Sequence, residues 1–423
     1  MSPQPFIMRS TAAFFLISLI AIFSSKALGG APLVSQAWYA GRYAKDFPPS
    51  QVSWSKYTHM TYAFAAPTND IRTLGLENSE PDTLVGFVKT AKANSVKALL
   101  SIGGYSGSIY WSSAVGSSQN RTAFVKTVTD YAVQYDLDGL DFVWEFPDRR
   151  TLGCNIVDPN DTSNFISFLE ELRQHPIGQC LTLTAGVSIA PYNDATGKPS
   201  TDLSRLANVL DYIVLLNYNI WGPWFSSVGP NAPLNDTCAA PANQRGSGVR
   251  AVAQWHEAGV PYEKILLGLP TYGHSYSVKK TDAFKNGSTT ELAEYPAFNH
   301  DVHPAGDRWD DPAGFVDPCG VSNPAAGEFS VSCRLINFWG LIENGFLNED
   351  GTPEYPHRFD QCSKGAFVYD PDKEVMVSYD SVESWAAKGK YIASAGLGGF
   401  AIWQAGGDYH DLLLDSVHRA SGM

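Results

Sequence analysis

Short continuous runs of apolar residues alternate along this chain with segments in which apolar positions recur at helical spacing. Runs of this length, bounded by Gly, Pro, Asn or Asp, are typical of strands that are buried on both faces. The helical segments show spacings such as that of Phe124, Val128 and Tyr131, which places the three side chains on one helix face. The strands predicted from these runs are residues 34–43, 58–66, 96–102, 137–147, 181–189, 212–218, 265–272 and 398–403.

Helices are predicted between several of these strands, over residues 84–94, 121–134 and 248–258, and through Phe165, Leu169 and Leu172. Eight strands that alternate with helices predict an α/β fold, a (β/α)8 TIM barrel, and a doubly wound open sheet is the alternative.

The alternation breaks between residues 275 and 364, a segment rich in Gly, Pro, Asp and Asn. It is longer than an ordinary connection between a strand and a helix, so we expect an inserted subdomain or a lid there. The predicted organisation is a signal peptide at 1–29, barrel strands one to seven within 30–274, the insertion at 275–364, and the closing part of the barrel at 365–423.

The fourth predicted strand has a polar face as well as an apolar one. Carboxylates are seldom fully buried unless they are paired or used, so this polar face is expected to line a pocket, with structural ion pairs as the alternative. Alternation with a period of two places Leu140, Phe142, Trp144 and Phe146 on one face and Gly139, Asp141, Val143 and Glu145 on the other.

This strand resembles the active-site strand of glycoside hydrolase family 18, the chitinases and chitinase-like lectins, whose pattern is D-G-x-D-x-D-W-E. The residues that match are Asp138, Gly139, Asp141, Trp144 and Glu145, and the chain departs from the pattern at Val143. Two further stretches resemble the family: Ser101-Ile102-Gly103-Gly104 matches S-x-G-G, and Leu216-Asn217-Tyr218-Asn219 resembles M-x-Y-D, with Leu at its first position and Asn at its last.

The resemblance implies substrate-assisted retaining hydrolysis of β-1,4-linked N-acetylglucosamine polymers, in which the acetamide oxygen of the sugar attacks the anomeric carbon. Glu145 would be the general acid and Asp141 the inner aspartate, while Tyr218 would bind the acetamide carbonyl. Asp141 and Glu145 lie four residues apart, roughly 13 Å along a strand, so they are not a nucleophile–acid pair, which needs about 5–5.5 Å.

The same resemblance implies a sugar site lined by Trp403 as its floor, Asn219, and the backbone of Gly103 and Gly104. Tyr105 and Trp221 follow strand ends and are candidates for further subsites, with core packing as the alternative for them and for Trp403. The family's insertion between strands seven and eight is a small α+β unit that forms one wall of the cleft, so the same is expected here.

The departure at Val143 determines how much activity is expected. An aspartate there would accept the acetamide N–H, and its loss should cost about 3–4 kcal/mol, or 10²–10³ in rate. Asn219 also lacks the charge of the family's aspartate. The leading hypothesis is a chitinase-like glycosidase of weak activity, favoured by Glu145, and the alternative is an inactive chitin-binding lectin, favoured by Val143 and Asn219.

Composition and leader sequence agree with a secreted protein. Arg9 precedes an apolar run from Thr11 to Phe23 that is followed by small residues, typical of a cleaved signal peptide, with an uncleaved anchor as the alternative. The formal charge is −13, and the sequence contains no stripe of basic residues. This argues against nucleic acid and anionic membranes as partners. We expect a secreted monomer that binds chitin or chito-oligosaccharides and needs no cofactor or metal.

Six cysteines in a secreted chain predict disulfides, and 15 pairings are possible. Cys319 with Cys333 is the local pairing expected. Sequons for N-glycosylation begin at Asn120, Asn160, Asn235 and Asn286.

Overall fold

The computed structural model describes residues 1–2, 32–76, 81–150, 154–310 and 334–423. Residues Leu33–Met423 form one compact unit. Residues 3–29 of the predicted signal peptide and the expected pairing of Cys319 with Cys333 fall outside these ranges.

Eight parallel strands form a closed barrel, which confirms the predicted (β/α)8 architecture. The strands pair in the order β1-β14-β8-β7-β6-β5-β4-β2, and pairing of β1 with β2 closes the ring. The short strand β3 (Leu74–Leu76) adds antiparallel to β2. The barrel strands are β1 (Val34–Ala40), β2 (His59–Pro67), β4 (Lys97–Gly103), β5 (Gly139–Val143), β6 (Thr182–Val187), β7 (Tyr212–Leu215), β8 (Ile265–Pro270) and β14 (Gly399–Trp403).

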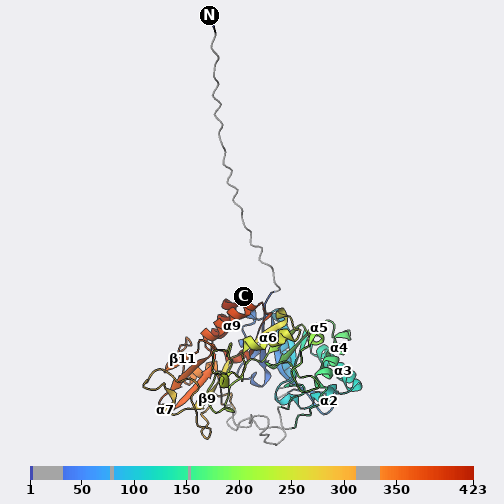
Figure 1. Ribbon diagram of the computed structural model, residues 1–423. Coiled ribbons are helices and arrows are strands. Elements are labelled where there is room, and N and C mark those ends of the chain that lie inside the picture. The colour runs from blue at the N-terminus through green and yellow to red at the C-terminus, as the bar shows by residue number, and fades with distance from the viewer. Residues whose placement is uncertain (3–31, 77–80, 151–153, 311–333) are drawn as a thin grey trace. The chain divides into compact units, whose positions relative to one another are not determined.

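Helices surround the barrel because each of them buries one apolar face against the strands. Ser117 caps the longest of them, its side chain accepting the N–H of Asn120, and Ser381 with Ser384 forms a capping box on the helix before β14. Helices α3 to α6 are visible on the outside of the barrel in Figure 1. The barrel helices are α1 (Pro81–Ala93), α2 (Trp111–Val115), α3 (Ser118–Gln134), α4 (Asp161–Gln174), α5 (Ser204–Val209), α6 (Gly248–Glu257), α9 (Val382–Ala395) and α10 (Leu412–Ser421).

The chain between β8 and α9 forms a second, antiparallel sheet with the order β10-β9-β13-β12-β11. Its strands span residues 272–379, so the sheet extends beyond the expected insertion boundaries of 275 and 364. The expected barrel closure at 365–423 therefore includes the hairpin of β12 and β13, which pairs in the second sheet instead. The elements are β9 (Tyr272–Ser277), α7 (Lys280–Ala283), β10 (Leu335–Asn337), α8 (Phe338–Glu343), β11 (His357–Phe359), β12 (Ala366–Asp370) and β13 (Val375–Tyr379).

The central strand β5 is shorter than predicted, because it leaves the ladder after Val143. Outside the barrel, Trp144 stacks on Trp111 with ring centroids 5.6 Å apart, and Phe142 meets Trp111 edge to face. Inside the barrel, a separate apolar cluster surrounds Val143. The predicted alternation therefore holds as far as Trp144, and Glu145 lies in the loop just beyond the strand.

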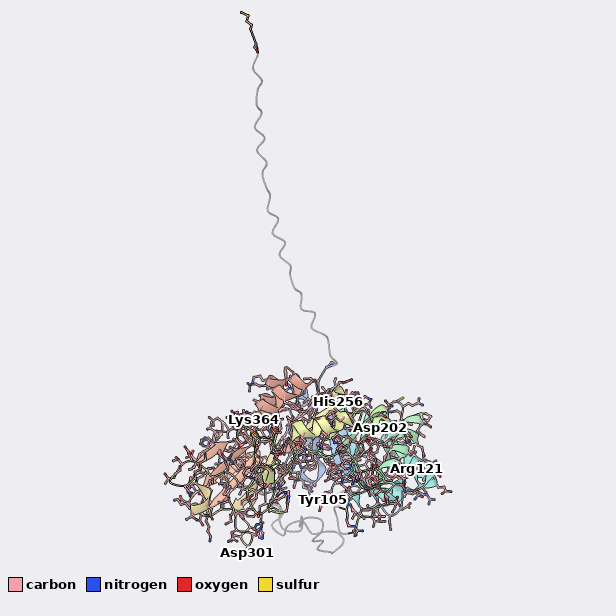
Figure 2. The ribbon with its side chains drawn as sticks, in the orientation of Figure 1. Tyr105, Arg121, Asp202, His256, Asp301 and Lys364 are labelled. Carbon is pink, nitrogen blue, oxygen red and sulfur yellow. A yellow bond between two sulfur atoms is a disulfide. The ribbon has the colours of Figure 1, made fainter. Side chains whose placement is uncertain are left out.

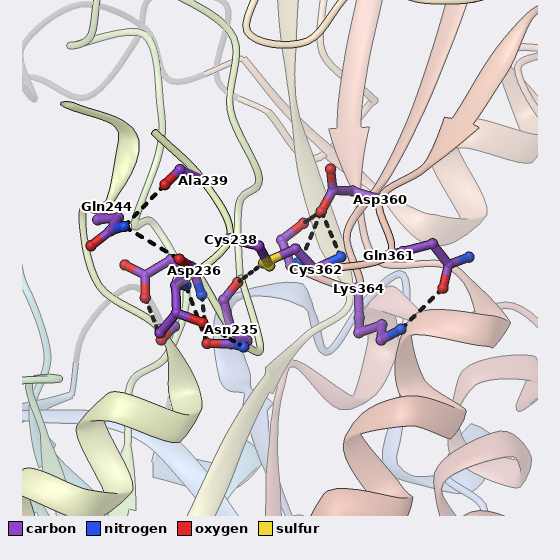
Figure 3. The surroundings of a disulfide bond; sticks show 12 residues. Asn235, Asp236, Cys238, Ala239, Gln244, Asp360, Gln361, Cys362 and Lys364 are labelled. Carbon is purple, nitrogen blue, oxygen red and sulfur yellow. Dashed lines mark hydrogen bonds between the residues drawn. A yellow bond between two sulfur atoms is a disulfide. The ribbon is translucent and has the colours of Figure 1, made fainter. Parts of the chain in front are cut away.

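A disulfide between Cys238 and Cys362 joins the loop after β7 to the loop after β11 (Figure 3). Hydrogen bonds to carboxylates order both loops. Asp236 accepts the N–H of Gly246 at 2.9 Å, and Asp360 accepts the N–H of Ser363 at 2.7 Å. The bridge therefore ties the antiparallel sheet to the barrel loops.

Replacing Cys238 and Cys362 together by Ser should lower the free energy of unfolding by about 2–5 kcal/mol, because the bridge spans 124 residues and constrains the unfolded chain. Urea unfolding followed by tryptophan fluorescence measures this. Cys180→Ser is the matched control, since Cys180 is an exposed free thiol and its change should stay within about 0.5 kcal/mol. Equal stability of the double variant and the control would contradict the prediction.

Candidate functional site

Asp141 points into the barrel and is fully buried. Strand register places Ser101 of β4 and Thr184 of β6 level with it, and both hydroxyls donate to its carboxylate, at 2.7 and 2.6 Å. The indole Nε1 of Trp38 on β1 donates a third bond at 2.9 Å. Burial raises the pKa of Asp141, and the three hydrogen bonds oppose that rise.

Glu145 lies two residues beyond the carboxyl end of β5 and is half-buried. Its backbone N–H donates to Oγ of Ser108 at 2.9 Å, and that hydroxyl donates to the carbonyl of Gly104 at 2.7 Å. Burial raises the pKa of Glu145 to about 7. A carboxyl with this pKa is partly protonated at neutral pH, which is the state that a general acid needs.

Val143 shares one face of β5 with Asp141 and comes two residues before Glu145, with 2% of its surface exposed. It belongs to the cluster inside the barrel, with Trp38 and Ala401 among its members. A methyl group at Gly186 would meet Val143 Cγ2 at 3.1 Å, so the surroundings of residue 143 are close-packed and apolar. The side chain there offers no hydrogen-bond acceptor to a ligand.

Tyr218 is half-buried just beyond the end of β7. Burial raises its pKa well above 10, and the charges of Tyr272, Glu145 and Asp141 raise it further. The hydroxyl therefore remains protonated, and it is near enough to both carboxylates for their charges to affect its pKa. It is available as a hydrogen-bond donor.

Asn219 follows with a positive φ of 57°, a conformation that asparagine tolerates better than most residues. Its side-chain oxygen accepts from Tyr272 and His274, and its backbone N–H donates to Asn231 Oδ1 at 2.9 Å. The second sheet therefore holds this residue through β9.

Trp403 ends β14 and is half-buried. Its ring stacks on Phe64 with centroids 5.4 Å apart, and it meets Trp38 at 5.8 Å. Since Trp38 also donates to Asp141, Trp403 lies one side chain away from that carboxylate. The three rings form an aromatic cluster at the same end of the barrel.

Gly103 and Gly104 allow the end of β4 to approach β5. A Cβ at Gly103 would lie 2.1 Å from the carbonyl oxygen of Val143, and the N–H of Gly104 donates to that oxygen at 2.8 Å. Both residues have a positive φ. This close approach positions Ser108 beneath the backbone of Glu145, a role different from the expected approach to a sugar.

Tyr105 is half-buried at the start of the following 3₁₀ turn, Ser106–Ser108. It comes two residues after the end of β4, and Figure 2 shows it well below His256 of α6, the helix that precedes β8. It is therefore at the carboxyl rim with the other candidates.

Trp221 has to be removed from the candidate sugar-binding residues. Only 2% of its surface is exposed, and its ring packs against Phe225 and Tyr295 with Arg245 over it. No free ring face remains for a sugar. A position after a strand end therefore indicated the correct rim but not a ligand contact.

Several residues of the site were missed from the sequence: Trp38, Phe64, Ser108, Thr184 and Tyr272. Trp38 carried a usable signal, because alternation along β1 places it opposite Tyr39 and thus inside the barrel. The contacts of the others depend on strand register and on loops, which composition does not reveal.

The described part of the chain contains no group of three or more His, Cys, Asp or Glu side chains that could hold a metal ion. None of its helices is long and apolar enough to cross a bilayer.

Barrel enzymes place their functional groups at the carboxyl ends of the strands, and a carboxyl with a raised pKa is the general acid that cleavage of a glycoside requires there. Fold and site together define a glycosidase-like barrel. The family model "Glycosyl hydrolases family 18" matches residues 36–408, and the chain therefore belongs to this family.

Similar proteins support the assignment. A chitinase-like effector of Moniliophthora roreri is 53% identical over 407 residues, covering 96% of this chain and 97% of the relative. The crystal structure of a chitinase from Rhizomucor miehei has a TM-score of 0.79 at 28% identity, covering 91% of this chain and 99% of that one. A Cycas revoluta family 18 chitinase in complex with (GlcNAc)3 shares the fold, with a TM-score of 0.69 at 22% identity, covering 92% and 100% of the two chains.

Glu145→Gln should make the folded protein more stable than wild type at high pH but not at low pH. The pKa of Glu145 is raised from 4.5 to about 7 on folding, so its favourable contribution is complete below pH 4.5 and is lost as the pH rises to 7. The variant should therefore gain about 1–3 kcal/mol relative to wild type at pH 8 and nothing at pH 4. Thermal unfolding at both pH values measures this, and a difference independent of pH would contradict it.

Proposed function

We propose that this protein is a secreted chitinase-like protein that binds oligomers of β-1,4-linked N-acetylglucosamine at the carboxyl rim of the barrel and hydrolyses them only weakly. The observation that carries the proposal is the close-packed apolar surrounding of Val143, at the position where the family pattern has a carboxylate.

The binding groups support the first half of the proposal. Trp403 with Phe64 offers an aromatic surface to the C–H face of a sugar ring, and the protonated hydroxyl of Tyr218 can donate to an acetamide carbonyl. Both lie at the rim that carries Glu145. A ligand with alternating apolar ring faces and acetamide groups matches these partners.

The weak hydrolysis follows from what remains of the catalytic groups. Glu145 can protonate the glycosidic oxygen as the acetamide oxygen of the sugar attacks the anomeric carbon and the bond to the leaving sugar breaks. Positive charge then develops on the acetamide nitrogen. Asp141 is held by Trp38, Ser101 and Thr184, and Val143 has no acceptor, so neither side chain offsets that charge.

Pure binding without turnover is the second candidate, and Val143 and Asn219 together favour it. The relative from M. roreri is named chitinase-like rather than chitinase, which supports this candidate. Retention of Glu145 with its raised pKa supports residual hydrolysis.

Secretion rests on the signal-like residues 1–29 and is supported by the disulfide between Cys238 and Cys362, since such bridges persist in oxidising compartments. N-glycosylation at the four sequons and a monomeric state belong to the same proposal.

Val143→Asp should raise the rate of hydrolysis of a fluorogenic chitobioside by about 10²–10³, because the carboxylate restores an acceptor for the acetamide N–H. Glu145→Gln sets the background rate and is the matched control in both the wild-type and the Val143→Asp protein. Wild-type turnover above that background excludes the pure binding protein. Unchanged turnover in Val143→Asp, with sugar binding intact, would contradict this account of residue 143.

Trp403→Ala should weaken binding of N-acetylchitotetraose by about 30-fold, since a stacked indole in a binding site contributes about 2 kcal/mol. Trp403→Phe keeps a smaller aromatic surface and should lose less. Isothermal titration calorimetry measures both constants, and thermal unfolding verifies the fold. Equal affinity of all three proteins would show that the sugar binds elsewhere.

A further inference from the structure

The side-chain amide of Asn219 is held at one end only. Its Oδ1 accepts two hydrogen bonds, from the hydroxyl of Tyr272 at 2.8 Å and from Nε2 of His274 at 3.0 Å. Within the described residues, no side chain or carbonyl accepts a hydrogen bond from its Nδ2. Nδ2 is also not one of the buried polar atoms that lack a partner. The oxygen therefore already accepts two hydrogen bonds, and the amide N–H groups remain available to a ligand.

The two donors come from one strand of the second sheet. Tyr272 and His274 are two residues apart on β9, so alternation places them on the same face. Asn231 fixes the loop from the other side, because its Oδ1 accepts the backbone N–H of Asn219 while its Nδ2 donates to the carbonyl of Tyr272 at 2.9 Å. The position of Asn219 is thus set by both the loop and the strand.

The ring of His274 supports this orientation of the amide. His274 has 1% of its surface exposed, and its Nδ1 has no partner among the described residues. A buried N–H without an acceptor is rarer in proteins than a buried acceptor without a donor. The proton is therefore favoured on Nε2, which makes His274 the donor and Asn219 Oδ1 the acceptor. Burial also lowers the pKa of His274 to about 3, so the ring is neutral.

We propose that His274 is a positioning residue, which fixes the amide of Asn219 so that its Nδ2 group donates to an acceptor oxygen of the bound sugar. The acceptor is a hydroxyl or an acetamide carbonyl of an N-acetylglucosamine oligomer, and this identity rests on the proposed function. An aspartate at 219 would present only acceptors in the same place. The substitution of Asn for the family's aspartate therefore changes what the site recognises as well as its charge.

Binding of N-acetylchitotetraose to the full chain, measured by calorimetry at pH 7, tests the proposal. His274→Leu removes the Nε2 donor and should weaken binding about tenfold, while His274→Gln supplies an amide donor and should restore affinity to within about threefold. Asn219→Asp, which keeps the shape, should also weaken binding about tenfold. Thermal unfolding of each variant separates loss of fold from loss of affinity.

Nitrogen chemical shifts of the His274 ring supply a readout that a merely structural role would not move. A proton on Nε2, together with a shift of the Asn219 side-chain N–H signals on adding the sugar, is expected. A proton on Nδ1, wild-type affinity in His274→Leu, or equal losses in His274→Leu and His274→Gln would overturn the proposal.

Failure of the wild-type protein to bind the tetramer would overturn the proposed function and, with it, donation to a sugar. The position of the proton on the His274 ring would then still test the orientation of the Asn219 amide. A proton on Nε2 upholds the fixed orientation of the amide, and a proton on Nδ1 overturns it.

Discussion

The buried carboxylate of Asp141 is the constraint on which the rest of the site depends. A carboxylate inside a barrel is costly unless its oxygens receive hydrogen bonds, and Trp38, Ser101 and Thr184 supply three of them from three different strands. These bonds require β1, β4, β5 and β6 to keep their register. The register in turn sets where β5 ends, and therefore where Glu145 leaves the barrel.

Val143 is the residue through which this constraint limits chemistry. Two positions beyond Asp141 on the strand and two before Glu145, it packs its methyl groups into the apolar cluster inside the barrel. A valine side chain cannot exchange a proton or share charge with either Asp141 or Glu145. Burial raises the pKa of Glu145, which leaves an acid that can donate a proton, while residue 143 supplies no carboxylate to help the sugar react.

The pattern of buried runs was sufficient to predict the eight barrel strands, because parallel strands covered on both faces are continuously apolar. Alternation also placed Asp141 inside the barrel and Trp144 outside it. The second sheet was located only roughly, since a segment rich in Gly, Pro, Asp and Asn marks a break in the alternation but does not show which strands pair across it. The contacts of Trp221 and His274 could not be predicted, because both depend on how distant loops pack rather than on local spacing.

The neutral residues of the site form a consistent set. Valine at 143, asparagine at 219 and a neutral histidine at 274 each avoid a charge that would need a partner or solvent at the barrel rim. A site with fewer charges loses less hydration energy when a neutral sugar covers it, so the same substitutions that weaken transition-state stabilisation favour ground-state binding. Retained aromatic surfaces with reduced charge are therefore what the proposed function, binding of a neutral oligosaccharide with only weak hydrolysis, would require of this barrel.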